Sequence, residues 1–211
     1  MGLVGIFGAG GFGREVLPLM RGGADEVVFV DDAPQACMIN GARVLNWDEF
    51  CAADASSKQA VLAVGNSVAR QAMAFRCAAE GIGFAHAQAA NALILDEVQI
   101  GEGEIICPFA AITSNVQIGR HFHANIYSYV AHDCVIGDFV TFAPQVCCNG
   151  NVHIHDHAYI GTGAVLKQGT AERPLVIGRG AVVGMGAIVT KNVAPGETVV
   201  GNPARALGAA R

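Results

Sequence analysis

The sequence predicts two architectures in one chain: a small parallel α/β domain over residues 1–86 and a parallel β-helix over residues 87–211. Three observations predict them. Apolar residues recur with a period of six in the second part, strand and helix patterns alternate in the first part, and a glycine-rich loop follows the first strand.

The period of six runs from Ile94 to Leu166. Its thirteen positions carry no charge and no amide: Ile94, Ile100, Ile106, Ile112, Ile118, Ala124, Val130, Ile136, Phe142, Cys148, Ile154, Ile160 and Leu166. A second row follows four residues after each position, and Glu104 is its charged exception. A helix repeats every 3.6 residues and a simple strand every 2, so a hexapeptide repeat indicates a β-helix whose coils stack about 4.8 Å apart. A polar loop, Lys167–Pro174, interrupts the repeat, which resumes at Ile177.

The first part of the chain shows strands and helices in alternation. The strands are expected at Leu3–Phe7, Glu26–Val30, Ala60–Val64 and Gly83–His86, with a minor one near Val44; the helices are expected at Arg14–Arg21, Trp47–Cys51 and Ser67–Gly81; a polar, Ala-rich link follows at Ala87–Ala92. This order is typical of a parallel sheet.

Composition excludes several classes of function. The 211 residues carry a net charge of −5, with 15% charged residues, so there is no basic surface for nucleic acid. The sequence shows neither a long apolar run nor a signal peptide, and we therefore expect a cytoplasmic protein without a membrane partner. The seven cysteines show no C-x-x-C spacing and are interpreted as reduced thiols.

The loop Gly8-x-Gly10-x-x-Gly13 follows a strand, opens a helix and precedes Asp31 at the end of the next strand. Glycines there let backbone N–H groups approach a diphosphate, and the acid can bind a ribose hydroxyl. The domain is half the size of a full dinucleotide fold, which favours one nucleoside diphosphate over NAD. A purely structural tight turn is the alternative.

His132 is the polar side chain of the repeat that best fits catalysis. It lies two residues after the inward Val130, on the outer face near a corner, and Asp133 follows it. A neutral imidazole accepts a proton near pH 7, and a nearby carboxylate fixes its tautomer. A solvated surface histidine is the alternative. Asn125 is a second polar candidate in the same stretch.

Five motifs occur in one order: Gly8–Glu15, Asp31-Asp32, Ala63–Asn66, His132–Gly137 and Gly201–Arg205. In this combination the chain resembles the sialic-acid O-acetyltransferase family of left-handed β-helix sugar acyltransferases, which includes nucleotide-sugar N-acetyltransferases. The resemblance implies a homotrimer, acetyl-CoA as co-substrate, and a role in surface polysaccharide or glycan biosynthesis.

The resemblance also implies roles for individual residues. His132 matches the catalytic base and Asp133 its acidic neighbour; Gly10, Gly11 and Phe12 match the loop at the nucleotide sugar, with Asp31, Asp32 and Gly65 at its base and ribose; Thr141, Thr162 and Met185 match the acetyl-CoA groove, to which we add Arg205 as a phosphate contact. Several relatives carry histidine where Thr141 and Phe12 stand.

The predicted activity is transfer of an acetyl group from acetyl-CoA to the amine of a nucleotide-linked 4-amino-4,6-dideoxyhexose. Two alternatives remain open: O-acetylation of a sugar hydroxyl, as on sialic acid, and a non-catalytic protein that binds a nucleotide sugar or NAD. No metal is expected. His153-x-His155-x-His157 straddles the inward Ile154, and a carbonic-anhydrase-like triad would need a histidine where Thr162 stands.

Overall fold

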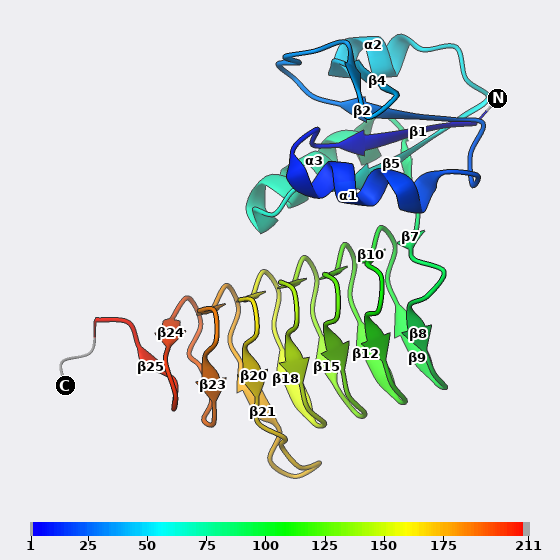
Figure 1. The fold of residues 1–211 in the computed structure, drawn as a ribbon. Coiled ribbons are helices and arrows are strands. Elements are labelled where there is room, and N and C mark those ends of the chain that lie inside the picture. Colours follow the sequence, from blue (N-terminus) through cyan, green and yellow to red (C-terminus); the bar gives the residue numbers. More distant parts are fainter. Residues whose placement is uncertain (1, 209–211) are drawn as a thin grey trace. The chain divides into compact units, whose positions relative to one another are not determined.

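The computed structural model describes residues 2–208, which divide into two compact units. One unit comprises the residues up to Ala87 together with Glu102–Ile105, a segment that the sequence analysis assigned to the solenoid. The other comprises Gln88–Gly101 and the chain from Ile106 onward. Figure 1 shows helices around a sheet in the first unit and stacked coils in the second.

The first unit is a six-stranded sheet in the order β3-β4-β2-β1-β5-β6. Its strands are β1 (Gly2–Phe7), β2 (Glu26–Val30), β3 (Met38–Ile39), β4 (Ala42–Leu45), β5 (Ser57–Leu62) and β6 (Gly83–Phe84), and its helices are α1 (Gly11–Met20), α2 (Trp47–Ala52) and α3 (Ser67–Ala79). All pairs are parallel except β3 with β4. The predicted elements are confirmed, although α1 and β5 each begin three residues earlier than expected and β3 was not predicted.

The helices of this unit begin where polar side chains can satisfy the first backbone N–H groups. Asn66 accepts hydrogen bonds from the backbone N–H groups of Val68 and Ala69 at the start of α3. Asn46 and Glu49 form a reciprocal capping box at the start of α2. In contrast, α1 follows Gly10, which has no side chain to cap the helix. Its first N–H groups are therefore left without such a cap, at the carboxyl end of β1.

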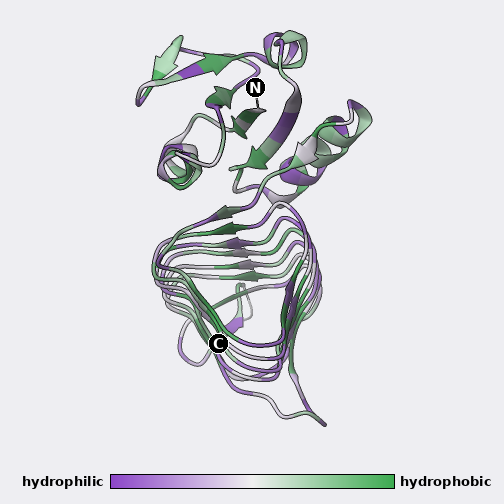
Figure 2. Cartoon of the chain, turned by 90° about the vertical axis from the view of Figure 1, so that its right-hand side faces the viewer, coloured by the Kyte–Doolittle hydropathy of each residue, from purple (hydrophilic) through white to green (hydrophobic). Residues whose placement is uncertain are grey.

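The second unit is a left-handed β-helix built from three sheets, whose strands are parallel except for the antiparallel pair β24 and β25. The first sheet contains β7 (Ala87–Gln88), β10 (Ile105–Ile106), β13 (His123–Ala124), β16 (Thr141–Phe142), β19 (Tyr159–Ile160), β22 (Val182–Val183), β24 (Thr198–Val200) and β25 (Arg205–Ala206). The second contains β8 (Leu93–Ile94), β11 (Ala111–Ile112), β14 (Tyr129–Val130), β17 (Cys147–Cys148), β20 (Val165–Leu166) and β23 (Ile188–Val189). The third contains β9 (Val98–Ile100), β12 (Val116–Ile118), β15 (Val135–Ile136), β18 (Val152–Ile154) and β21 (Leu175–Ile177). Seen end-on, the coils form a triangular tube (Figure 2).

The predicted inward rows form the core of this tube. Every sixth residue from Ile106 to Leu166 is buried, whereas Ile94 and Ile100 are half-buried because they lie in the first coil. The Ala87–Ala92 segment was predicted to be a link, but it is part of the first coil. The Ala89 N–H donates to the Ile106 carbonyl at 2.9 Å. The repeat of six therefore sets the fold of more than half of the chain.

Glu104, the charged exception of the second row, is buried next to a histidine. Its carboxylate contacts His86 Nδ1 at 2.6 Å. Burial raises the pKa of Glu104, while the hydrogen bond to His86 acts in the opposite direction. A buried carboxylate is thus accommodated here because it has a polar partner.

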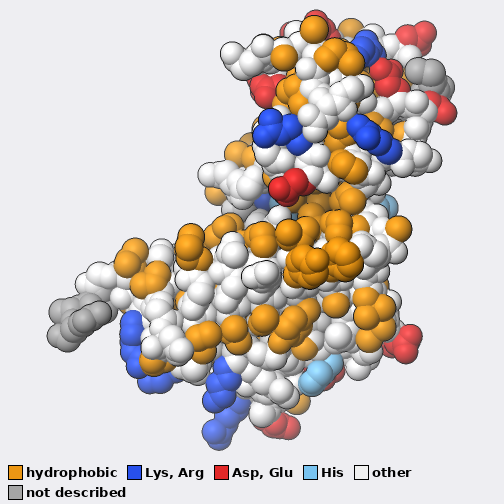
Figure 3. All heavy atoms as spheres, viewed as in Figure 1, with side chains coloured by type: hydrophobic (Ala, Val, Ile, Leu, Met, Phe, Trp, Pro, Cys, Tyr) orange, Lys and Arg blue, Asp and Glu red, His pale blue; other side chains and the backbone are white. Residues whose placement is uncertain are grey.

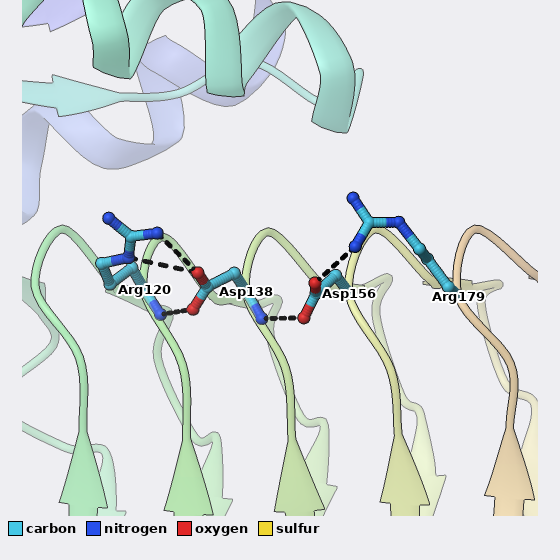
Figure 4. A network of polar contacts seen from close by, with 4 residues as sticks. All are labelled: Arg120, Asp138, Asp156 and Arg179. Carbon is cyan, nitrogen blue, oxygen red and sulfur yellow. Dashed lines mark hydrogen bonds and ion pairs between the residues drawn. The ribbon is translucent and has the colours of Figure 1, made fainter.

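A ladder of charged residues crosses the coils at the corner that follows the third sheet (Figure 4). The Arg120 guanidinium pairs with Asp138 at 2.7 Å, the Asp138 backbone N–H donates to Asp156 at 3.0 Å, and Arg179 pairs with Asp156 at 2.8 Å. Although burial opposes it, the bonds and the charge of Arg120 hold the pKa of Asp138 below its usual value. The ladder joins successive coils where strands end.

The inward and outward assignments predict a contrast between two adjacent residues. Ile136→Ala is expected to lower the free energy of unfolding by about 2–5 kcal/mol, because the lost carbons leave a cavity in the tube. Val135→Ala, at a position that is 42% exposed, is expected to change it by less than about 0.5 kcal/mol. Chemical denaturation measures the free energy of unfolding of both variants. Equal losses would contradict the inward position of Ile136 and the outward position of Val135.

Candidate active site

The glycine loop lies at the point where the strand order of the first unit reverses. Strand β1 has β2 on one side and β5 on the other, and ligands of open α/β sheets bind beyond the carboxyl ends of the strands at such a point. Gly8 adopts φ +100°, and a Cβ at Gly13 would collide with the Gly8 carbonyl oxygen. Both positions therefore require glycine. Gly10 and Gly11 face open space, so a ligand can approach their backbone.

A cavity of about 180 Å³ opens next to this loop. It is lined by Phe7, Gly8, Val30, Asp31, Asp32, Met73 and Arg76. Asp31 Oδ1 accepts a hydrogen bond from the Ala33 N–H at 3.0 Å, which fixes the carboxylate in its turn. The structure thus brings two of the predicted acids together with the glycine loop. Phe12 lies in the first turn of α1 and is half-buried.

The loop after β5 is held from behind by a buried arginine. Arg70 has no exposed surface and donates from Nη1 to the Val64 carbonyl at 2.7 Å. Burial lowers its pKa to about 10, so the guanidinium stays charged at neutral pH. This charge lies behind Gly65, the residue predicted to approach the nucleotide, and next to the start of α3.

His132 and Asp133 form a dyad at a corner of the solenoid. Nδ1 of His132 lies 2.7 Å from Asp133 Oδ2, and their side chains are 49% and 47% exposed. The register places the imidazole on the outside of the tube, as predicted. Hydrogen bonding of Nδ1 to a carboxylate leaves Nε2 as the nitrogen that can accept a proton. The dyad thus has the arrangement of a general base and its orienting acid.

The solenoid turn fixes the backbone of this dyad. Asp133 has φ 59°, and left-handed residues recur every six positions through the repeat: Glu97, Gly103, Phe109, Asn115, His121, Tyr127, Asp133, Phe139, Gln145, Asn151, His157 and Gly163. The Asp133 N–H donates to the Ser114 carbonyl of the preceding coil at 3.2 Å. The conformation of Asp133 therefore belongs to the coil geometry, which presents adjacent side chains on one corner.

Gly150 lies against the His132 ring, one coil further along. A Cβ at Gly150 would lie 2.5 Å from His132 Cε1 and 2.6 Å from Nε2. The Asn151 N–H also donates to the His132 carbonyl at 3.0 Å, which fixes the two coils in register. The absence of a side chain at Gly150 thus makes room for the imidazole. We did not single out this glycine from the sequence, although it follows His132 by one full coil of eighteen residues.

Two thiols lie inside the tube beneath the dyad. Cys134 Sγ is 3.9 Å from Cys148 Sγ, and both residues are buried. The hydrogen bond with Cys134 and burial both raise the pKa of Cys148, so its thiol stays protonated. All seven cysteines are free thiols, in agreement with the sequence prediction.

The other predicted site residues lie away from the dyad within one chain. Asn125 donates from Nδ2 to the Phe142 carbonyl at 2.8 Å, a bond to the backbone of the next coil. Thr141 is buried in β16. Thr162 and Met185 follow strands of the first sheet, in adjacent coils, whereas His132 follows a strand of the second. Arg205 is exposed in β25 and donates to the Ala204 carbonyl.

The corner that carries His132 continues into a cationic hollow. The Lys167–Pro174 loop leaves the tube after β20, and Lys191 follows β23 in the next coil. The hollow, of about 500 Å³, is lined by Lys167, Gln168, Gly169, Arg173, Pro174, Leu175, Val176, Thr190, Lys191 and Asn192. Three cations and no carboxylate line it.

Among residues 2–208, no group of three or more His, Cys, Asp and Glu side chains is placed to hold a metal ion. Within the same residues, no helix has the length and apolar character needed to cross a membrane.

Similarity to known proteins identifies the family of this chain. The family profile of the PglD N-terminal domain matches residues 4–76. GDP-perosamine N-acetyltransferase of Escherichia coli O157:H7 is 49% identical over 97% of this chain and 96% of its own length. The chain belongs to this family of hexapeptide-repeat acetyltransferases.

Two solved structures match over nearly the whole chain. WeeI from Acinetobacter baumannii AYE is 54% identical, covers 98% of this chain and 100% of its own, and superposes with a TM-score of 0.96. The acetyltransferase domain of PglB from Neisseria gonorrhoeae FA1090, solved in complex with acetyl coenzyme A, is 28% identical. It covers 97% of this chain and 98% of its own, and superposes with a TM-score of 0.87. The predicted fold class is confirmed.

The packing of His132 predicts the effect of a single added methyl group. Gly150→Ala is expected to displace the imidazole by about 1 Å or into another rotamer, because carbon atoms pack no closer than about 3.5 Å. A crystal structure of the variant measures the displacement. Gly83→Ala is the control, since a Cβ there meets open space. An unmoved His132 ring in Gly150→Ala would show that Gly150 does not define its position.

Proposed function

We propose that this chain is an acetyl-CoA-dependent N-acetyltransferase that acts on a GDP-linked 4-amino-4,6-dideoxyhexose. The observation that carries the proposal is the His132–Asp133 dyad at 2.7 Å, in a chain that is similar over its full length to GDP-perosamine N-acetyltransferase. The α/β unit binds the nucleotide through the glycine loop, Asp31, Asp32 and Gly65. The solenoid unit supplies the base and binds acetyl-CoA.

His132 acts in this proposal as the general base. Its Nε2 takes a proton from the sugar amine as the nitrogen forms a bond to the thioester carbonyl carbon. The carbon–sulfur bond then breaks, and the proton held by the imidazole passes to the departing thiolate. Asp133 holds the Nδ1–H and stabilises the imidazolium. Because Thr141 is buried, a backbone N–H at the corner is the better donor to the oxyanion.

The coenzyme is assigned to the corner that carries His132. Three coils separate His132 from Lys191, which corresponds to about 14 Å at the spacing of stacked strands. This distance suits an extended pantetheine arm, with the thioester at His132 and the phosphates at Lys167, Arg173 and Lys191. Figure 3 shows lysine and arginine side chains along the lower edge of the solenoid toward its C-terminal end.

Thr162, Met185 and Arg205 keep their proposed place at acetyl-CoA if two chains form the groove, whereas Thr141, which was predicted beside them, is buried within its own chain. Large apolar side chains are exposed on the solenoid: Leu93, Leu95, Phe109, Ile126, Tyr127, Val135, Tyr159, Met185, Val200 and Leu207. Apolar side chains are spread over the face in Figure 3. Neighbouring coils bring some of them into contact, as where the Phe109 and Tyr127 rings stack at 4.8 Å, and contiguous exposed apolar surface is typical of a subunit interface. We therefore propose a homotrimer in which the corner after the first sheet of one chain faces His132 of its neighbour.

The first test is activity. The protein is incubated with acetyl-CoA and GDP-, UDP- or dTDP-linked 4-amino-4,6-dideoxy sugars, and free thiol is followed; fastest turnover is expected with the GDP sugar. His132→Ala is expected to lower kcat by about 10²–10⁴-fold, the usual contribution of a general base, with little change in the Kd for either substrate. His155→Ala, at an exposed histidine of another corner, is the control.

The result that would overturn the assignment is near-normal turnover by His132→Ala. A protein that binds the nucleotide sugar but not acetyl-CoA in calorimetry would instead support a non-catalytic sensor. Faster thiol release with sialic acid than with any amino sugar would support the O-acetyltransferase alternative.

The second test concerns assembly. Light scattering is expected to give three times the mass of one chain, because the proposed groove needs two chains and a trimer supplies three equivalent ones. A monomer that is fully active would contradict the shared groove. The control for concentration dependence is the same measurement over a hundredfold dilution series.

A further inference from the structure

An ion pair with exposed side chains lies at the cavity next to the glycine loop, and the sequence analysis assigned no role to its arginine. Arg76 of α3 donates from Nη1 to both carboxylate oxygens of Asp32, at 3.1 and 3.0 Å. Both residues line the cavity together with the apolar side chains of Phe7, Val30 and Met73. A donor and an acceptor thus lie side by side at the edge of an apolar hollow.

Trp47 holds the arginine from one side. The guanidinium carbon lies 4.0 Å from the centroid of the Trp47 ring, and that ring packs against Phe7 at 5.9 Å. Trp47 is the first residue of α2, whose start is fixed by its capping box. Arg76 is therefore oriented by a stacked ring and by an ion pair. Since the pair uses only Nη1, Nη2 and Nε remain as further donors.

The two acids in the cavity differ in the hydrogen bonds that their carboxylates accept. Asp31 Oδ1 already accepts the Ala33 N–H in its own turn. Asp32 has no such local bond among the described residues, and each of its oxygens can accept more than one hydrogen bond. Asp31 suits the ribose, as the sequence analysis assigned it, and Asp32 is left for the base.

An acceptor beside a donor matches one nucleobase in particular. Guanine presents the N1–H and N2–H donors next to the O6 acceptor. A carboxylate can accept from both donors while a guanidinium donates to O6. Uracil and thymine have one N–H between two carbonyl groups, and adenine has an acceptor at N1 where guanine has a donor. These bases leave the carboxylate partly unsatisfied.

We propose that Asp32 and Arg76, held by Trp47, form the guanine-reading pair of this enzyme, with Asp32 on N1–H and N2–H and Arg76 on O6. The proposal rests on the proposed function and deepens it, since it assigns the choice of nucleotide to named side chains. Arg76 becomes a specificity-determining residue that no sequence motif indicated.

Calorimetry with GDP, inosine diphosphate and UDP tests the pair, because inosine lacks only the N2 amine of guanine. The wild-type protein is expected to bind GDP about 10-fold or more tighter than inosine diphosphate, as for one hydrogen bond to a charged group. Asp32→Ala and Asp32→Asn are expected to weaken the binding of GDP, so that the Kd values of GDP and inosine diphosphate differ by no more than about threefold. Arg76→Met is expected to weaken the binding of GDP and of inosine diphosphate about equally, because both bases carry O6.

Glu26→Ala is the matched control, since it breaks the Glu26–Arg43 pair, another exposed ion pair of the same unit. It is expected to leave all three affinities unchanged. Thermal denaturation of each variant identifies loss of folding, and the Asp32→Asn variant preserves shape if Asp32→Ala does not fold.

The proposal is overturned if the wild-type protein binds GDP and inosine diphosphate equally, or if the Asp32 variants keep the wild-type ratio. Acetyl transfer to a GDP sugar would then leave the proposed function standing. Binding of no nucleotide at all, together with no acetyl transfer, would overturn both.

Discussion

Hydrogen bonding between successive coils is the constraint on which the solenoid depends. Backbone groups one coil apart pair with each other, as where the Ala131 N–H donates to the Cys148 carbonyl at 2.8 Å. Such pairing fixes the register at eighteen residues, so side chains with that spacing form columns on the outside of the tube. Ser114, His132 and Gly150 occupy one column for this reason. The neighbours of the catalytic candidate are thus decided by coil register, whatever the chemistry at the corner.

The α/β unit brings its polar groups together by a different means. Parallel strands end at one edge of a sheet, so the residues that follow β1, β2 and β5 meet there although they are far apart in sequence. Gly8, Asp31 and Gly65 meet in this way. The N-termini of α1, α2 and α3 lie at the same edge, and the buried charge of Arg70 lies behind that of α3. The edge is therefore suited to a ligand with negative charge.

The sequence could predict those features that a period or a local motif determines. The inward rows follow from the repeat of six, and the outward position of His132 follows from its distance to Val130. A cap at Asn66 or Ser67 follows from their residue types before a helical pattern, and the structure has it at Asn66. In each case the information lies within a few residues or in a sustained repeat.

The missed residues act through tertiary contacts. Arg76 meets Asp32 across 44 positions of sequence and reaches Trp47 from another helix, and no spacing rule relates these elements. Burial of Thr141 likewise depends on packing around its strand. The tertiary structure therefore adds the side chains that orient a site, whereas sequence motifs indicate those that carry its chemistry.

Exposure of the dyad determines what else the enzyme needs. About half of each side chain in the His132–Asp133 pair is open to solvent, and ion pairs in water are weak and screened. The same pair orients an imidazole and stabilises its charged form far better once water is excluded, because the local dielectric falls. One chain leaves this corner open. Acetyl transfer at this corner therefore needs a second surface that excludes water, and the homotrimer that we propose would supply one from the exposed apolar side chains of a neighbouring solenoid.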